Sequence, residues 1–193
     1  MKRFVLISIV IAACGKSSSS GGGGGDDKPV DVGPVNAAIP AAWKGKIEFT
    51  DQTFGDKHEK YEAAAPKDWK SSFMPGSFEP DGAMKDAFGF GARYEVSGNC
   101  DGDCVAKDWQ ATADKVEFKQ FTDGTSSAKI VKDEKGAGWR QVIAEGGDNT
   151  YIVRAWWVDG AKRYNACRAT LGKEAKDLVP AFVAACQTAK AKE

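Results

Sequence analysis

The sequence has one histidine among its 193 residues, and this scarcity excludes several kinds of catalytic site. A catalytic zinc site commonly takes two or three histidine ligands, which this chain cannot supply. Any Ser-His or Cys-His nucleophile system would have to use His58. His58 stands among Asp56, Lys57, Glu59 and Lys60, a pattern typical of a solvent-exposed strand. The sequence therefore predicts no catalytic histidine and no zinc site built on histidine.

The chain also lacks an excess of charge of either sign and an apolar run long enough to span a bilayer. It has 27 basic and 27 acidic side chains. A near-neutral surface gives no electrostatic reason to expect nucleic acid or anionic lipid as a partner. A membrane-spanning helix needs about 20 apolar residues, and the run that starts at Phe4 stops at Ala13. We therefore expect no nucleic-acid partner and no membrane-spanning helix.

The first fourteen residues have the layout of a secretory signal. Lys2 and Arg3 precede the apolar run, which ends in small residues before Cys14. The tetrad Ile11-Ala12-Ala13-Cys14 resembles the bacterial lipobox, in which cleavage before the cysteine leaves a lipidated N-terminal residue. This resemblance implies a signal peptide over residues 1–13 and a lipid on Cys14 that attaches the protein to the membrane of the cell envelope.

A polar, low-complexity segment follows Cys14. Gly15 and Lys16 are not the acidic pair that often signals inner-membrane retention in lipoproteins, and this favours the outer membrane. Residues 17–25 are serines followed by glycines, which bury no apolar area to offset the entropy of ordering the backbone. We expect a lipidated, flexible Ser/Gly/Pro linker over residues 14–40. Residues 41–193 contain no internal repeat and no second linker, so we expect one globular domain there.

Four cysteines remain after Cys14 is assigned to the lipid. An even number of cysteines in an exported chain indicates disulfides, and four cysteines allow three pairings. We favour Cys100–Cys104, which would join a strand end to a helix start, and Cys167–Cys186, which would join a strand to the last helix. Their spacing matches no common zinc pattern.

The distribution of apolar residues predicts a mixed α+β domain. Alternating residues and turn signals indicate strands at 46–49, 56–63 (at a sheet edge), 88–96, 127–132, 139–144, 150–158 and 162–171. Residues 70–86 are expected to form a long loop. One helix would begin at a cap on Asp101 or Asp103 and bury the face of Val105, Trp109, Thr112 and Val116. The last helix would begin within residues 172–177 and bury the face of Val179, Phe182, Val183 and Cys186.

This order of elements, with Pro66-Lys67-Asp68-Trp69 after an early strand, resembles the PsbP/Mog1-like family over about residues 44–190. In that family an antiparallel sheet carries helices on both faces. The resemblance implies an α/β/α sandwich, here with two disulfides, of which Cys167–Cys186 is not part of the family pattern. A fold of this kind does not fix a function.

Three tryptophans near the predicted central hairpin are candidates for ligand binding, together with Arg154. Trp156 and Trp157 are consecutive, so on a strand they point to opposite faces. If helices cover both faces, both side chains belong to the core. If only one face is covered, one tryptophan is exposed beside Arg154 or Arg140, and Trp139, Trp156 and Trp157 would contribute to a recognition surface.

No acid–base set, metal site or cofactor motif is assembled in the sequence. Asn99, Asp101 and Asp103 have the spacing of the first ligands of a calcium loop, but Cys104 and Gln110 stand where that loop needs glycine and glutamate. We expect a non-catalytic, lipid-anchored envelope protein that binds a protein or a small ligand, or assists assembly. The alternatives are a hydrolase of envelope polymers with a carboxylate pair, and a module that binds calcium or another small ligand.

Overall fold

The computed structural model describes residues 28–55, 60–72, 74–82, 84–89, 91–99, 108–122, 127–146, 150–159 and 163–192. The predicted signal peptide, the lipid site at Cys14 and the Ser/Gly segment lie outside these ranges. His58, the Cys100–Cys104 pair, Asp101 and Asp103 also lie outside them, so the histidine, disulfide and calcium predictions on these residues stay predictions.

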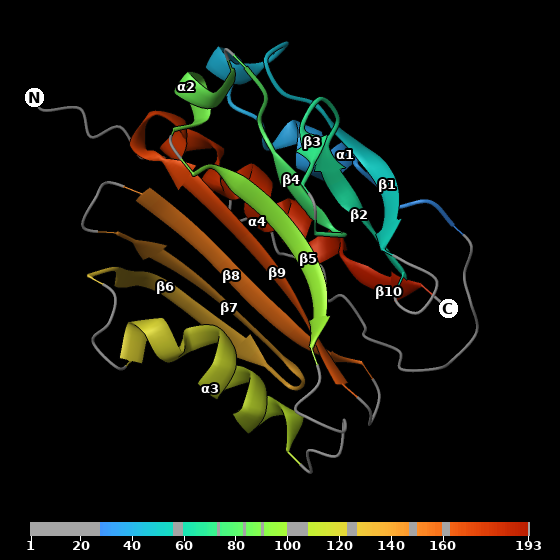
Figure 1. Ribbon diagram of the computed structural model, residues 1–193, viewed down its shortest axis with the longest axis vertical. Coiled ribbons are helices and arrows are strands. Elements are labelled where there is room, and N and C mark those ends of the chain that lie inside the picture. Colours follow the sequence, from blue (N-terminus) through green and yellow to red (C-terminus); the bar gives the residue numbers. More distant parts are fainter. Residues whose placement is uncertain are drawn as a thin grey trace, which may run out of the picture.

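A seven-stranded antiparallel sheet forms the centre of the domain (Figure 1). In spatial order its strands are β3 (Lys70–Ser71), β4 (Ser77–Glu79), β5 (Arg93–Asn99), β9 (Arg163–Gly172), β8 (Thr150–Asp159), β7 (Trp139–Glu145) and β6 (Lys129–Gly136). Strands β7, β8 and β9 match the predicted ranges within one or two residues. Strand β5 begins later than the predicted residue 88, because Gly89 and Gly91 have φ angles of 90° and 76° and interrupt the extended backbone.

A second, three-stranded sheet contains β1 (Phe49–Gly55), β2 (Lys60–Pro66) and β10 (Lys190–Lys192). The sequence placed the strand of β2 at an edge, and this prediction was wrong. Strand β2 is the central strand, because the C-terminal β10 pairs with its free side. The strand expected at 46–49 also begins later, at Phe49, because Gly45 and Lys46 form a turn.

Helices lie on both faces of the large sheet (Figure 1). Helix α3 (Trp109–Thr122) packs on β8 and β9 from one side, and α4 (Val179–Thr188) packs on the same two strands from the other. The short elements α1 (Gly33–Ala37), η1 (Ala41–Trp43), α2 (Met84–Phe88) and η2 (Lys173–Leu178) complete the domain. The α+β class and the antiparallel sheet are therefore confirmed.

Helix α3 buries a different face from the predicted one. Trp109 is buried, but Val116 is 48% exposed. The buried positions are Trp109, Ala113, Glu117 and Phe118, which follow the helical period from Trp109. The predicted face did not include Glu117, which is buried in the structure. The helix begins at Trp109 and not after Asp101 or Asp103, so the predicted cap was wrong: Asp108 caps it, because its Oδ1 accepts a hydrogen bond from the Ala111 N–H at 3.0 Å.

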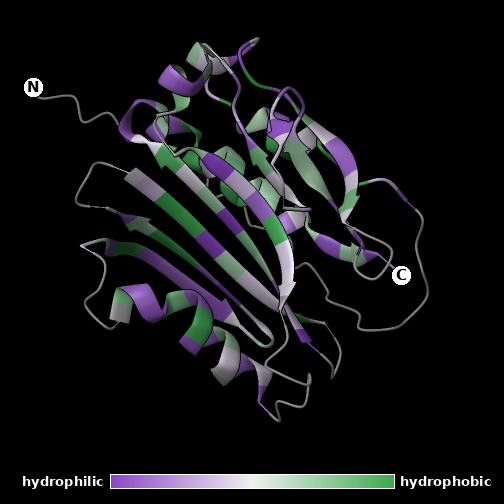
Figure 2. Ribbon diagram, viewed as in Figure 1, coloured by the Kyte–Doolittle hydropathy of each residue, from purple (hydrophilic) through white to green (hydrophobic). Residues whose placement is uncertain are grey.

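The larger hydrophobic core lies between the large sheet and α4. Phe182 of α4 is at its centre, with ring centroids 5.2 Å from Phe49 and 5.5 Å from Trp69. Figure 2 shows α4 as largely hydrophobic, whereas α3 is mostly hydrophilic. The Cys167–Cys186 disulfide joins β9 to α4 with Cα atoms 5.5 Å apart, which confirms this predicted pair. It is the one disulfide within the described ranges.

Part of the predicted linker is folded. Val35 of α1 is fully buried in the larger core, and α1 packs against α4. The Asn36 side-chain amide donates to the Phe49 carbonyl and accepts from the Phe49 N–H, both at 2.8 Å. The folded domain therefore begins before the predicted residue 41, because Pro34 occupies the first turn of a helix instead of extending a spacer. None of the described helices is long and apolar enough to span a bilayer.

Candidate functional site

The structure divides the four predicted ligand residues between the two faces of the large sheet. Trp156 and Arg154 face α3, whereas Trp157 and Trp139 face the side of α4. Trp156 is 3% exposed and its Nε1 donates to Asp114 Oδ1 at 3.0 Å, so it belongs to the smaller core beneath α3. Trp139 and Trp157 are direct cross-strand neighbours. The tryptophans and Arg154 therefore cannot form one surface.

A groove of about 610 Å³ lies between β7, β8 and the C-terminal end of α4. We call it the tryptophan groove, and it is lined by Trp139, Arg140, Gln141, Ala155, Trp156, Trp157, Cys186, Gln187 and Ala189. It forms because α4 packs over β8 and β9, so the neighbouring strand β7 is left beside the helix and not beneath it.

Trp139 is the most exposed aromatic side chain of the described residues, at 42%. Its cross-strand partner on β6 is Gly136. A Cβ atom at residue 136 would lie only 2.3 Å from Trp139 Nε1, so the indole lies across the glycine. An aromatic ring that covers a strand glycine is a known way to fill that gap in a sheet. Gly136 thus supports the indole in an exposed position at the wall of the groove.

The remaining polar groups of the groove are neutral amides. Gln187 Nε2 donates to Gln141 Oε1 at 3.4 Å across its floor. Arg140 is the one charged residue of the lining, but its guanidinium binds Asp133 at 2.6 Å and Asp114 of α3 at 3.1 Å, on the other face of the sheet. These carboxylates raise the pKa of Arg140 well above its usual range. Among the described residues, the groove therefore combines aromatic faces and amides without a free charge.

Opposite the groove, α3 is attached to the sheet by a buried ionic network. Glu117 is 2% exposed and accepts from Arg168 Nε at 3.0 Å and Arg168 Nη2 at 2.8 Å. Its Oε1 also accepts from the Tyr164 hydroxyl at 3.2 Å. Arg168 Nη1 reaches Glu95 Oε1 at 3.4 Å. Sequence reasoning missed Glu117, Arg168 and Glu95. The signal that could have indicated a buried ionic network was a charged residue in the interior of an apolar strand.

The same network bears on the predicted hydrolase alternative. Glu95 and Glu117 are the two carboxylates that converge on one point of this face, and both bind Arg168. Their oxygens accept hydrogen bonds from Arg168, and Glu117 also accepts from the Tyr164 hydroxyl, so both carboxylates are engaged by the fold itself. This arrangement is better suited to attaching α3 than to acid–base chemistry.

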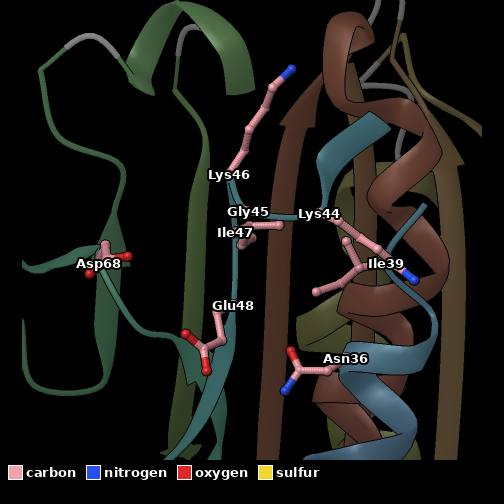
Figure 3. Close-up of a pocket in the computed structure, with 8 residues that line it drawn as sticks. All are labelled: Asn36, Ile39, Lys44, Gly45, Lys46, Ile47, Glu48 and Asp68. Carbon is pink, nitrogen blue, oxygen red and sulfur yellow. The ribbon is translucent and has the colours of Figure 1, made fainter. Parts of the chain in front are cut away.

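A further cavity of about 380 Å³ lies where α1 meets the start of β1 (Figure 3). Its polar side chains are largely used by the fold itself. Asn36 binds the backbone of Phe49, and Glu48 Oε2 binds Lys67 Nζ at 3.1 Å. Figure 3 shows Lys46 pointing away from the other lining side chains, and its Nζ lies 5.5 Å from the Trp43 ring centroid. The cavity is therefore a weaker candidate than the tryptophan groove.

No group of three or more His, Cys, Asp or Glu side chains within the described ranges could hold a metal ion. The calcium alternative depends on Asp101 and Asp103, which lie outside those ranges, so it stays a prediction.

No family model matches the sequence, and no curated protein matches it. The solution structure of cyanobacterial PsbP (CyanoP) from Synechocystis sp. PCC 6803 is a similar solved structure. The two have 12% sequence identity and a TM-score of 0.48, over 73% of this chain and 92% of that chain. At this level the likeness adds nothing to a functional argument, which must come from the residues of this chain.

Proposed function

We propose that this protein is a non-catalytic binding protein of the cell envelope, held there by a lipid on Cys14, which binds an envelope protein or a small ligand in the tryptophan groove. The observation that carries the proposal is the exposed Trp139 indole lying across Gly136. An aromatic side chain that is already held in place loses little conformational entropy on binding. An aromatic wall with a few polar groups is the usual composition of a ligand site.

The chemistry of the groove favours binding over catalysis. Its cysteine, Cys186, is bonded to Cys167, and its other polar side chains are the amides of Gln141 and Gln187. Neither a disulfide sulfur nor an amide serves as an activated nucleophile or a general base. An uncharged groove suits an uncharged segment of a partner or a neutral small molecule.

The envelope location rests on the signal layout, the lipobox residues and the disulfide, which is typical of oxidising compartments. The start of the described chain also fits a tether. Lys190 Nζ donates to the carbonyl of Lys28 at 3.1 Å, so the chain enters the domain beside β10, and the preceding residue Ala189 lines the groove. Intact mass spectrometry of the native protein should give an acylated chain that begins at Cys14. An unmodified chain that begins at Met1 would contradict the anchor.

Binding in the groove can be tested by photo-crosslinking in the native envelope. A benzophenone amino acid is placed at Gln187, an exposed position on the wall opposite Trp139. We expect a light-dependent adduct that is lost when Trp139→Ala is added to the same chain. The matched control carries the benzophenone at Val116, which is 48% exposed on α3 at the opposite face of the sheet. An adduct at residue 187 that survives Trp139→Ala, or equal adducts at both positions, would contradict the proposal.

A further inference from the structure

Two arginines face each other in the middle of the large sheet. Arg154 of β8 and Arg168 of β9 are direct cross-strand partners, and their side chains are 20% and 31% exposed. Like charges directly opposite each other destabilise a sheet, and burial increases the cost because water screens them less. A pair of this kind needs anionic partners for both members.

The two members differ in how closely a carboxylate approaches them. Arg168 hydrogen-bonds Glu117 at 2.8 Å, Arg140 hydrogen-bonds Asp133 at 2.6 Å, and Arg93 hydrogen-bonds Glu79 at 2.6 Å. Arg154 has a longer ion pair, in which its Nη1 lies 3.8 Å from Glu117 Oε2, and it makes no hydrogen bond to a carboxylate among the described residues. Arg154 is therefore an exception among these arginines.

The other partner of Arg154 is neutral. With its amide oxygen turned toward Arg154, Gln120 accepts from Nε and Nη2 at 3.3 Å. This leaves Arg154 Nη1 without a hydrogen-bond acceptor among the described residues. Burial, together with the charge of Arg168, lowers the pKa of the Arg154 guanidinium, and the carboxylates of Glu117 and Glu95 oppose this only in part. By contrast, Glu117 raises the pKa of Arg168 although burial opposes this.

Arg154 lines a small cleft on the face that α3 leaves open. This arginine cleft has a volume of about 240 Å³ and is lined by Gly91, Arg93, Glu95, Arg154, Arg168 and Thr170. Arg93 uses Nε and Nη2 to bind Glu79, so its Nη1 is also without a described acceptor. The carboxylate of the cleft, Glu95, is paired with Arg168. The lining thus has more cations than anions and presents unused guanidinium N–H groups from β5 and β8.

We propose that the arginine cleft is a binding site for a small oxyanion, a carboxylate or a phosphate group, with Arg154 as its main ligand and Arg93 as the second. A planar guanidinium forms short, charge-assisted hydrogen bonds with both kinds of oxyanion. The hydroxyl of Thr170, next to Arg168 on the same face of β9, is a third donor. Gly91 leaves the mouth of the cleft open, because a Cβ atom there would meet nothing within 4 Å. This site is separate from the tryptophan groove, which lies on the other side of β8.

The test titrates the full mature protein in detergent with inorganic phosphate and, separately, with succinate, at ionic strength held constant with sodium chloride. We expect at least one anion to raise the midpoint of urea unfolding and to give a saturable heat of binding. Phosphate alone would identify a phosphate site, succinate alone a carboxylate site, and both a general oxyanion site; each result supports the proposal.

The variants locate the binding. Arg154→Gln should weaken it about tenfold or more, because the main charged donor is lost. Lys129→Gln, which removes an exposed charge from the edge strand β6, should leave it unchanged. If Arg154→Gln does not fold, Arg154→Lys is used in its place. This variant keeps the charge without the planar donor group and should also bind the anion more weakly than the wild type. The proposal is overturned if neither anion binds at constant ionic strength, or if the Arg154 variants bind as tightly as Lys129→Gln.

Discussion

Glu117 is the residue on which the attachment of α3 depends most. It is nearly inaccessible to solvent and binds Arg168 and the Tyr164 hydroxyl. Glu117→Gln would leave Arg168 without its main counter-charge, and the loss of one partner of a buried pair costs about 3 kcal/mol. Urea unfolding followed by circular dichroism should show this decrease in the free energy of unfolding.

The matched control for this substitution is Glu134→Gln on β6. Glu134 makes an ion pair with Lys132 at 3.1 Å, but both side chains are about half exposed. Exposed pairs of this kind contribute about 0.2–1 kcal/mol at most. Equal effects of the two substitutions would show that the Glu117 network does not stabilise the fold.

Gly136 has a specific role, because the absence of a side chain there leaves room for the Trp139 indole. Gly136→Ala should displace the end of that side chain at a cost of about 1 kcal/mol. The predicted consequence is a lower yield of the adduct at Gln187 with little loss of stability. An unchanged yield from a folded Gly136→Ala chain would show that the position of the indole does not matter.

At the scale of elements, the disulfide attaches α4 to β9. Its cysteines are 19 residues apart, and closing a loop of that length stabilises a fold by about 3 kcal/mol in the chain-entropy model. Replacing Cys167 and Cys186 by alanine, in a chain that also carries Cys100→Ala and Cys104→Ala, should lower the free energy of unfolding by that amount. The reference is the chain with only the latter two changes, and equal stability of the two chains would contradict this account of α4.

Strand β10 is held to β2 by a pH-sensitive contact. Glu62 is 4% exposed, and its oxygens lie 3.0 Å from Lys190 Nζ and 3.6 Å from Lys192 Nζ. Burial alone would raise the pKa of Glu62, but the two ammonium groups lower it below its ordinary value of 4.5. The contact therefore stabilises the fold above about pH 4.5 and is lost as the pH falls through the lower folded-state pKa.

Comparison of the wild type with Glu62→Gln isolates this contact. The lysines are partly exposed, so the difference in the free energy of unfolding at pH 6 should be about 0.5–1 kcal/mol. It should shrink when urea unfolding is repeated at successively lower pH, because Glu62 becomes protonated as the pH falls through its lowered pKa. A difference that does not depend on pH would assign the effect to packing.

The elements that the sequence predicted well are those whose pattern is local. Strand β8 is a run of β-branched and aromatic residues with Arg154 as its one internal charge, it is followed by Asp159-Gly160, and the apolar face of α4 repeats at helical spacing. Strand β10 could not be predicted, because Lys-Ala-Lys has no apolar pattern and its pairing is determined by β2. The face of α3 was missed for a related reason: Glu117 is buried only because Arg168 comes from a strand 51 residues away.

The candidate site was predictable only in part. Alternation along β8 separates Trp156 from Trp157, but the sequence does not say which face each helix covers or where it ends. The groove at Trp139 arises because α4 covers β8 and β9 but leaves β7 beside it. The arginine cleft arises from charges on three neighbouring strands, which only the strand order brings together.

At the scale of the whole molecule, one sheet separates two surfaces of different chemistry. The groove beside α4 is aromatic and uncharged, and the cleft beside α3 is cationic. The chain enters at Lys28, near the end of α4 that borders the groove. An anchored domain would therefore have its groove near the origin of its tether.

Hydroxyl-radical footprinting tests most directly whether the tryptophan groove is occupied in the cell envelope. Modification of Trp139 is measured by mass spectrometry in intact envelopes and in the purified protein, with the similarly exposed Met74 as the internal reference. The account predicts that Trp139 is protected in the envelope relative to Met74, and that this protection is lost on purification. Equal ratios of Trp139 to Met74 modification in the two samples would contradict it.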